Sequence, residues 1–375
     1  DLVEVPTLGD GANRVPGLGD MRAAGAAEIA RGVKRSVTSG ERSTVAAKPP
    51  DRTAEARVPI AYVGLPGQKN LGDDAMLEAI RGLMPWAHID AEIDEPAAVM
   101  LGGGTLLNAG GYYLNRIRRV DGPNRERLVF GTGMRSPDFW GITERIDDWE
   151  PFLGTAMSVG VRGPLSKRGL QEWGFSGDIE IVGDPALALT RPKDAASVEG
   201  RVVLSPLHTG GECWGNDDAA VLDAYASVAR ELHDAGHELI MLTAHPNDDR
   251  WAIEVMRASG VPDMRYVPGH ADMPGALEAI ASSELVIGER LHSVVLAAAM
   301  GTPFVAVEYR PKVRDFAASL EAETWCVRTD DIGSLGSLVV DRLASDEDHQ
   351  EAVRSLRSRL EKHASDSEDF LCGET

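Results

Sequence analysis

The sequence predicts an α/β protein built from two consecutive halves, each with its own parallel sheet. Three observations support this fold class. Short apolar runs of strand length alternate with longer helical patterns. Several of the apolar runs end in glycine-containing loops, and a polar, proline-containing stretch near residue 195 separates a first series from a second. The chain has 375 residues, which is long enough for two domains with cores of their own.

Composition excludes several classes of partner. There are 38 basic against 59 acidic residues, a net charge of −21, which argues against binding to nucleic acid or to an anionic membrane. The longest helix-like apolar run, 294–300, is far shorter than the roughly 20 residues of a membrane span, and no signal segment opens the chain. Cys213, Cys326 and Cys372 are scattered, which favours a reduced, cytoplasmic protein without structural zinc.

The first 57 residues differ in composition from the rest. They are rich in Gly, Ala, Ser, Thr, Pro and Arg and contain few large apolar residues. Such a segment cannot bury enough apolar surface to fold by itself. We therefore expect 1–57 to be a disordered tail without a catalytic role.

The first domain is expected over 58–195. Its strands are predicted at 58–64, 97–101, 127–134, 157–161 and 179–182, with helical patterns between them. After the first strand comes a loop with Asn70 and Asp73 that fits neither a dinucleotide nor a phosphate-loop motif. Two interpretations stay open, because Asp73 could cap the following helix or both residues could bind substrate.

Three consecutive glycines follow the second predicted strand, at 102–104, and Thr105 comes next. Glycines without side chains let backbone N–H groups approach a ligand closely. We therefore take Gly103, Gly104 and Thr105 as candidate substrate-binding residues.

The second domain is expected over 196–375 and ends in a charged helix at 346–368. Strands are predicted at 201–205, 238–243 and 266–267, and helices at 217–235, 251–259 and 273–281. Two such halves imply a cleft between them, which is a common place for a ligand. His245 follows a strand of this half and is a candidate to line the cleft, whereas His363 on the terminal helix is expected to be solvated.

The stretch 286–307 is the centre of the predicted site. It indicates a strand, a polar loop, an alanine-rich buried helix and a second strand. Glu289, Arg290, His292 and Ser293 crowd the start of the helix, where free N–H groups and the helix dipole favour an anion. An alternative stays open, in which Arg290 and Glu289 only form an ion pair and His292 is packed in the core.

Five motifs in order resemble the polysaccharide pyruvyl transferase family. They are Gln68 to Ala75, Leu101 to Thr105, Val161 to Pro164, Val182 to Pro185 and Gly288 to Ser293. This resemblance implies two Rossmann-like domains facing a cleft, similar to the GT-B glycosyltransferase type. It also implies transfer of pyruvate from phosphoenolpyruvate onto a saccharide as a ketal, without a cofactor.

The residues can be tested against that chemistry. Ketal formation must hold a phosphate and a carboxylate, protonate the methylene carbon of the donor and deprotonate two sugar hydroxyls. The fork of Arg290 suits the anions, and His292 suits proton transfer because an imidazole can both give and take a proton. Glu289 is a candidate to orient His292. Aspartate pairs at 217–218, 248–249 and 330–331 are better explained as helix caps than as metal ligands.

One position departs from the family pattern. Members often place an arginine after the first strand of the second half, whereas this chain has Leu207 and His208. His208 is expected to take over the anion contact, or the donor is held differently. Two other functions stay open: a nucleotide-sugar glycosyltransferase using the loop 301–303 and Glu308, and a noncatalytic binding protein. The acceptor and the state of association, including a homo-oligomer, are not determined by the sequence.

Overall fold

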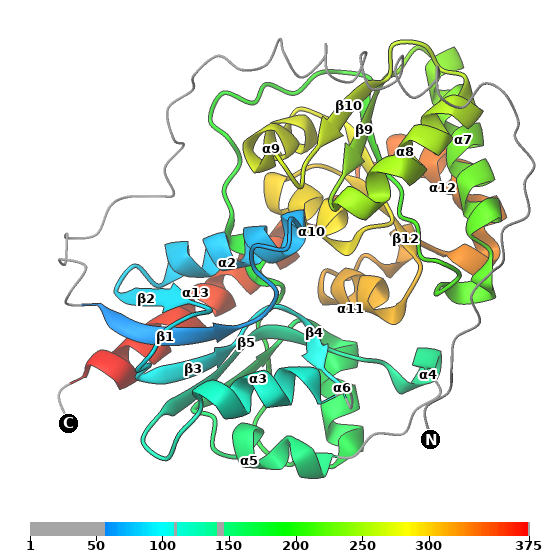
Figure 1. Ribbon diagram of the computed structural model, residues 1–375. Coiled ribbons are helices and arrows are strands. Elements are labelled where there is room, and N and C mark those ends of the chain that lie inside the picture. Colours follow the sequence, from blue (N-terminus) through cyan, green and yellow to red (C-terminus); the bar gives the residue numbers. More distant parts are fainter. Residues whose placement is uncertain (1–56, 109–110, 141–145, 374–375) are drawn as a thin grey trace, which may run out of the picture. The chain divides into compact units, whose positions relative to one another are not determined.

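The computed structural model describes residues 57–108, 111–140 and 146–373. The predicted tail, apart from Arg57, lies outside these residues. The described chain forms two parallel sheets with helices packed on their faces (Figure 1). The predicted fold class, two Rossmann-like α/β halves, is confirmed.

The first sheet has the strand order β2-β1-β3-β5-β6-β7, and β4 pairs with β5. The order reverses between β1 and β3, so the crevice at the carboxyl ends of these two strands is the expected ligand position. The strands are β1 (Val58–Val63), β2 (Ala87–Asp90), β3 (Ala98–Leu101), β4 (Gly104–Leu107), β5 (Glu126–Met134), β6 (Ser158–Val161) and β7 (Glu180–Ile181). The accompanying helices are α2 (Leu71–Leu83), α3 (Tyr112–Val120), α4 (Pro137–Trp140), α5 (Glu150–Leu153) and α6 (Pro164–Trp173), with 3₁₀ turns η2 (Ile146–Asp148) and η3 (Pro185–Ala188).

The second sheet has the order β10-β9-β8-β11-β12-β13. This is the dinucleotide-type order 3-2-1-4-5-6, with its switch point between β8 and β11. The strands are β8 (Arg201–Ser205), β9 (Glu238–Thr243), β10 (Arg265–Pro268), β11 (Leu285–Gly288), β12 (Phe304–Glu308) and β13 (Cys326–Arg328). The helices are α7 (Asp218–Asp234), α8 (Pro246–Ser259), α9 (Met273–Ala281), α10 (Leu291–Met300), α11 (Pro311–Ser319), α12 (Leu335–Leu343) and α13 (Gln350–Cys372), with 3₁₀ turns η4 (Trp214–Asn216), η5 (Glu323–Trp325) and η6 (Thr329–Ser334).

Helix α10 lies at the centre of the second half. Every residue from Leu291 to Met300 is buried except His292. Small alanines let the helix pack closely against β11, β12, α9 and η3. A helix that is apolar on all sides needs such complete burial, so the one polar residue left accessible on it is conspicuous.

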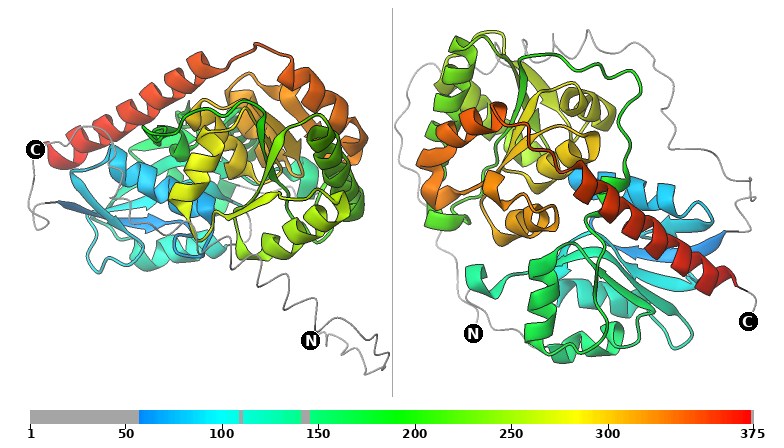
Figure 2. Two further views of the ribbon diagram at one scale, coloured as in Figure 1. Left: turned by 90° about the horizontal axis from the view of Figure 1, so that it is seen from above. Right: turned by 180° about the vertical axis from the view of Figure 1, so that it is seen from behind.

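The last helix, α13, belongs to both halves. It contacts α2 and η3 of the first half as well as α10 of the second, and Figure 2 shows it running beside the first half. His363 on α13 is 3% exposed, and its Nε2 lies 3.1 Å from both Val129 O and Ser158 Oγ. The expectation that His363 is solvated was wrong, because α13 turns this face onto the first sheet.

Three short strands, β2, β4 and β13, were not predicted. Each has four residues or fewer, too few to establish an alternating pattern. Strand β4 also changes the interpretation of the glycine loop, since Gly104 and Thr105 pair with Thr132 and Gly133 of β5. The glycine-rich segment is therefore partly sheet.

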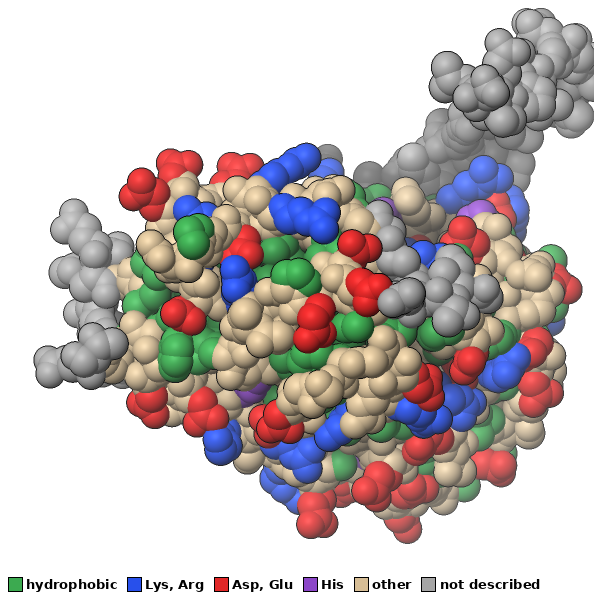
Figure 3. Space-filling view, turned by 90° about the horizontal axis from the view of Figure 1, so that it is seen from below, with side chains coloured by type: hydrophobic (Ala, Val, Ile, Leu, Met, Phe, Trp, Pro, Cys, Tyr) green, Lys and Arg blue, Asp and Glu red, His purple; other side chains and the backbone are tan. Residues whose placement is uncertain are grey.

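The surface carries charges of both signs. On the face drawn in Figure 3, acidic and basic side chains are interspersed, with hydrophobic side chains between them. This face therefore offers no continuous basic surface to a polyanion. Along the described residues, every helix is too short or too polar to cross a lipid bilayer.

Candidate active site

A cavity of about 190 Å³ lies where the carboxyl ends of strands from both sheets meet. Its lining residues follow β1, β3, β6, β9, β11 and β12, and the rule for open parallel sheets places ligands at such strand ends. They are Leu65, Asn70, Asp73, Gly104, Thr105, Leu106, Tyr113, Arg162, Ala244, Arg290, Leu291, His292 and Lys312. The structure therefore brings together six predicted site residues: Asn70, Asp73, Gly104, Thr105, Arg290 and His292.

The start of α2 forms one wall of this cavity. Asn70 caps the helix, because its Oδ1 accepts a hydrogen bond from Gly72 N at 3.1 Å. Leu71 N donates to Ala244 O in the other half at 2.9 Å. A Cβ atom on Gly72 would lie 1.7 Å from His292 Nδ1. Gly72 is thus required for the close approach of His292 to the helix start.

His292 projects into the cavity from the first turn of α10. Arg290 is the N-cap residue with extended backbone angles, φ −63° and ψ 124°, so the helix begins only at Leu291. The polar loop predicted before this helix therefore reaches Arg290, which allows Arg290 and His292 to line one cavity. The His292 side chain is 14% exposed, and its Nε2 lies 3.6 Å from Asp184 Oδ2.

Asp184 is the carboxylate beside His292. It is fully buried, and its Oδ1 accepts from Ala186 N at 3.1 Å, which caps η3. Its Oδ2 has no hydrogen-bond partner among the described residues. A buried carboxylate oxygen without a partner is costly, and His292 is the cation-forming group within reach to compensate it.

Arg290 is held by a second buried carboxylate. Its Nε and Nη2 each donate at 2.7 Å to Asp248, which is fully buried at the start of α8. Burial acts to lower the pKa of Arg290, but the hydrogen bonds and charge of Asp248 outweigh it and raise the pKa. The fork of Arg290 is therefore already paired, and Nη1 is the nitrogen left for a ligand. Asp248 is thus an arginine partner and not a cap, since His245 caps α8.

Glu289 lies away from His292. It is fully buried, and its Oε2 accepts from Leu207 N at 2.7 Å. Burial raises the pKa of Glu289 well above its ordinary value. The expected role of orienting His292 has no supporting contact among the described residues, and Asp184 occupies that place instead. Glu289 joins the ends of β11 and β8.

Glu289→Gln is expected to leave stability nearly unchanged near pH 4 and to raise it above that of the native protein at neutral pH, because glutamine matches the protonated acid in shape but cannot ionise when the chain unfolds. In the native protein, a raised carboxyl pKa means that stability falls as pH rises from the unfolded pKa towards the folded one. In this window the free energy of unfolding falls by about 1.4 kcal/mol per pH unit for one such group. The variant should lack this fall. Urea unfolding of both proteins between pH 4 and pH 8, with linear extrapolation of the unfolding free energy to zero urea, measures the difference. Equal pH slopes would contradict a protonated Glu289.

Arg162 is a site residue that sequence reasoning did not single out, although its motif was noted. It follows β6, is fully buried and lines the cavity. Its Nη2 lies 3.4 Å from Asp315 Oδ2, whereas Nε and Nη1 have no partner among the described residues. A buried guanidinium with two unpaired donors suits a planar anion such as a carboxylate or phosphate.

Asp315 of α11 couples Arg162 to the second half. Its Oδ1 accepts from Leu165 N at 2.9 Å and Ser166 N at 3.1 Å, and its Oδ2 accepts from Ser166 Oγ at 2.6 Å. Gly163, the N-cap position of α6, has no side chain to cap with. The cap of α6 therefore comes from the other half, and a Cβ on Gly163 would lie 2.2 Å from Asp315 O.

Lys312 and Asp73 complete the charges of the cavity. Lys312 enters from the start of α11, and Asp73 from the first turn of α2. Burial raises the pKa of Asp73, while His292 and Lys312 act to lower it. Tyr309 lies beside Lys312, and although burial acts to raise its pKa, Lys312, Arg290 and Arg310 outweigh burial and lower it. The cavity thus combines cations for an anion with several proton-transfer groups.

Four other predicted residues lie outside the lining. Gly103 is packed against Met76, and Ser293 Oγ donates to Arg290 O at 2.6 Å, which stabilises the helix start. His245 Nδ1 accepts from Asn247 N at 3.1 Å. His208 is half exposed, stacked on Trp251 and 3.5 Å from Asp218 Oδ2. His208 is therefore displaced from the anion contact that the sequence suggested for it.

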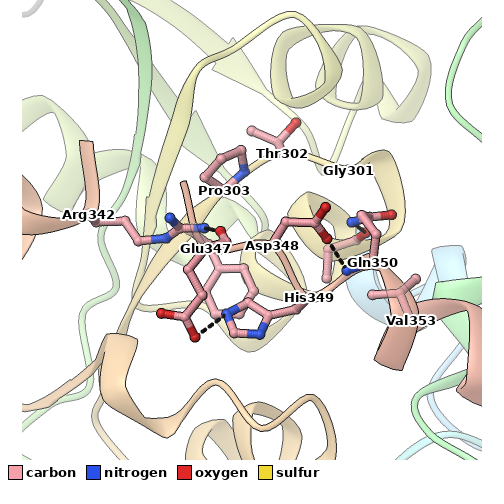
Figure 4. Close-up of a pocket in the computed structure, with 11 residues that line it drawn as sticks. Gly301, Thr302, Pro303, Arg342, Glu347, Asp348, His349, Gln350 and Val353 are labelled. Atoms are coloured by element: carbon pink, nitrogen blue, oxygen red, sulfur yellow. Dashed lines mark hydrogen bonds and ion pairs between the residues drawn. The ribbon is translucent and has the colours of Figure 1, made fainter. Parts of the chain in front are cut away.

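The elements expected to serve a nucleotide sugar are separated. The loop 301–303 precedes β12 and lines a second cavity of about 110 Å³ with Arg342, His349 and Gln350 (Figure 4). Glu308 ends the same strand, and its oxygens accept from Trp214 Nε1 at 3.1 Å and Arg314 Nε at 2.6 Å. These two elements therefore lie at opposite ends of β12.

The remaining aspartate pairs have structural contacts. Asp217 caps α7 by accepting from Ala220 N at 3.0 Å, as expected. Asp218 holds the loop after β8, accepting from Thr209 Oγ1 at 2.6 Å and Gly211 N at 2.8 Å. Within the described ranges, no group of three or more His, Cys, Asp or Glu side chains is arranged to hold a metal ion.

A comparison with known protein families identifies the family of this chain. The model of the polysaccharide pyruvyl transferase family matches residues 70–311, a range that contains every residue lining the cavity except Leu65 and Lys312. The chain belongs to the polysaccharide pyruvyl transferase family. A comparison with curated protein sequences found no match.

Two solved structures show a similar fold over most of this chain. A Listeria monocytogenes protein assigned as UDP-N-acetylglucosamine 2-epimerase is 12% identical, with a TM-score of 0.54 over 85% of this chain and 98% of that one. S. aureus MnaA, determined with UDP, is 12% identical, with a TM-score of 0.52 over 84% and 97%. At this identity the likeness concerns the fold alone, which is GT-B-like as the sequence predicted.

Proposed function

We propose that this member of the pyruvyl transferase family moves pyruvate from phosphoenolpyruvate onto a saccharide as a ketal. The observation that carries the proposal is one cavity in which Arg162 and Lys312 accompany His292 and Asp73. Ketal formation from an anionic enol ester needs both kinds of group within one ligand's reach.

The cations of the cavity suit the two anionic groups of the donor. Arg162 has two free donors, and Lys312 is a compact charge on the opposite half. The helix dipoles of α2 and α10, whose first turns line the cavity, add positive partial charge. We assign the donor carboxylate and phosphate to this set, with Arg290 Nη1 as a further contact.

The proton transfers need an acid and a base at different atoms. One sugar hydroxyl adds to the central donor carbon and loses its proton while the methylene carbon gains one. Phosphate then leaves, and the second hydroxyl attacks the same carbon. This hydroxyl loses its proton, which is taken up by the departing phosphate. His292 and Asp73 line the cavity together, and burial raises the pKa of Asp73. We assign the acid and base roles to this pair.

The donor can be tested directly. Phosphoenolpyruvate with a panel of saccharides should release inorganic phosphate, and the product should gain a methyl group next to a carboxylate. UDP-glucose with the same panel should release no UDP. UDP release without phosphate release would favour the glycosyltransferase alternative, and binding of saccharide without either product would favour a noncatalytic protein.

Arg290→Lys is expected to weaken phosphoenolpyruvate binding. Lysine keeps the charge but cannot pair with Asp248 through two nitrogens and still face the donor. The affinity should fall by about 1.5–3 kcal/mol, the range for a hydrogen bond to a charged group. Calorimetric titration with phosphoenolpyruvate measures this loss. An unchanged dissociation constant would limit Arg290 to its ion pair with Asp248.

A further inference from the structure

Beside the donor cavity lies a cluster of aromatic and arginine side chains that the donor does not use. This aromatic–arginine cluster consists of Arg135, Phe139, Trp140, Trp214 and Arg310. Arg135 follows β5, Phe139 and Trp140 form the end of α4, Trp214 follows β8, and Arg310 follows β12. All five therefore follow the carboxyl ends of strands, three from the first half and two from the second.

The cluster joins the two halves through ring contacts. The guanidinium carbons of Arg135 and Arg310 lie 4.1 Å and 5.0 Å from the Trp140 ring centroid. Phe139 meets Trp214 edge to face at 4.8 Å between ring centroids. Each residue of the cluster is only partly buried, so ring surface and polar edges remain open to a ligand.

The cluster lies close to the donor cavity. Arg310 lies 5.3 Å from the ring centroid of Tyr309, and Lys312 Nζ lies 5.1 Å from the same centroid. Lys312 itself lines the cavity. A molecule bound on the cluster would therefore have its near end next to the donor, as an acceptor must.

The arginines of the cluster are placed to take an anion. A guanidinium stacked on an aromatic ring keeps its in-plane N–H groups for hydrogen bonds. Arg135 Nε has no hydrogen-bond partner among the described residues. Arg310 donates to Glu212 O at 2.9 Å and to the Glu212 carboxylate, whose side chain is 59% exposed. An exposed surface carboxylate of this kind can be replaced by the carboxylate or phosphate of a ligand.

We propose that the aromatic–arginine cluster is the acceptor subsite and that the acceptor is a saccharide with a negatively charged group. The aromatic rings would pack against the C–H face of the sugar, while Arg135 and Arg310 bind its carboxylate or phosphate. This inference rests on the proposed function, because the donor's own charges are assigned to Arg162 and Lys312. In a chain with a net charge of −21, extra cations beside the donor cavity set a preference for an anionic acceptor.

The test is binding of four probes to the full chain without donor: glucose, glucuronate, glucose 1-phosphate and inorganic phosphate. At least one of the two charged sugars should bind about tenfold or more tightly than glucose and than free phosphate, as expected for one charge-assisted hydrogen bond. Comparing glucuronate with glucose 1-phosphate distinguishes a site for a carboxylate from a site for a phosphate.

Arg135→Ala should weaken binding of the preferred probe by about 10- to 100-fold and leave phosphoenolpyruvate binding unchanged. Arg118→Ala, which removes an exposed arginine of α3, is the matched control.

Equal binding of glucose and both charged sugars, or no effect of Arg135→Ala in a folded protein, would overturn the proposal. If Arg135→Ala fails to fold, Glu212→Gln is measured instead. This variant should free Arg310 and tighten binding of the charged sugar. Unchanged binding would contradict the proposed subsite. The donor is judged separately. If phosphoenolpyruvate does not bind the wild-type protein while the Arg135-dependent sugar binding persists, the proposed donor is wrong and the acceptor subsite stands.

Discussion

His292→Asn is expected to reduce turnover by roughly 10²–10⁴, the share usual for a positioned proton-transfer group, while the fold and donor binding persist. Asparagine keeps a polar side chain in the cavity but cannot exchange a proton. The imidazole is the accessible group on an otherwise buried helix and lies 3.6 Å from Asp184. Rapid-mixing measurement of phosphate release at saturating phosphoenolpyruvate gives the turnover, and calorimetry gives donor affinity.

The matched control is His233→Asn, which changes an exposed histidine on α7. It should leave turnover unchanged. If the His292→Asn enzyme works at the wild-type rate, His292 is only a packed residue. The proton transfer would then have to be assigned to Asp73 and its neighbours.

Arg162→Lys is expected to raise the dissociation constant of phosphoenolpyruvate by about a hundredfold, or about 3 kcal/mol, the upper end for hydrogen bonds to a charged group. Two donors of Arg162 have no partner among the described residues and can pair with one anion. Lysine cannot reproduce this geometry. Titration of the protein with phosphoenolpyruvate measures the change.

Arg168→Lys serves as the comparison, since Arg168 is an exposed residue of the same helix, α6. Donor affinity should be the same as in the wild-type protein. If the Arg162 variant also binds as tightly as the wild type, the donor anions must be held by Lys312, Arg290 and the helix starts instead.

Much of the fold follows from local patterns. The apolar runs that became β1, β3, β5, β8, β9, β11 and β12 are long enough, and bounded clearly enough by glycine or proline, to be recognised one at a time. The polar start of α10 is equally local, because Arg290 and His292 interrupt an otherwise apolar stretch. Strands β2 and β13 were missed because polar residues interrupt their apolar character, His88 and Asp90 in β2 and Arg328 in β13.

The partners within the site were not predictable in the same way. Local reasoning chose Glu289 as the carboxylate for His292, because the two are close in sequence. In the structure Glu289 binds Leu207 N, and Asp184 from the other half lies beside His292. Likewise, Asp248 pairs with Arg290, and Arg162 contacts Asp315. Each of these pairs joins segments far apart along the chain.

The sequence by itself determined the two α/β halves, the glycine-bearing loops and the polar helix start, because strand, turn and capping preferences act over a few residues. The tertiary structure decided which loops face each other, and so which carboxylate accompanies each cation. The burial of His363 was likewise decided by the tertiary structure, because helix α13 turns this residue onto the first sheet. Such contacts depend on strand order and on the packing of one half against the other, and these are set by burial summed over the whole chain.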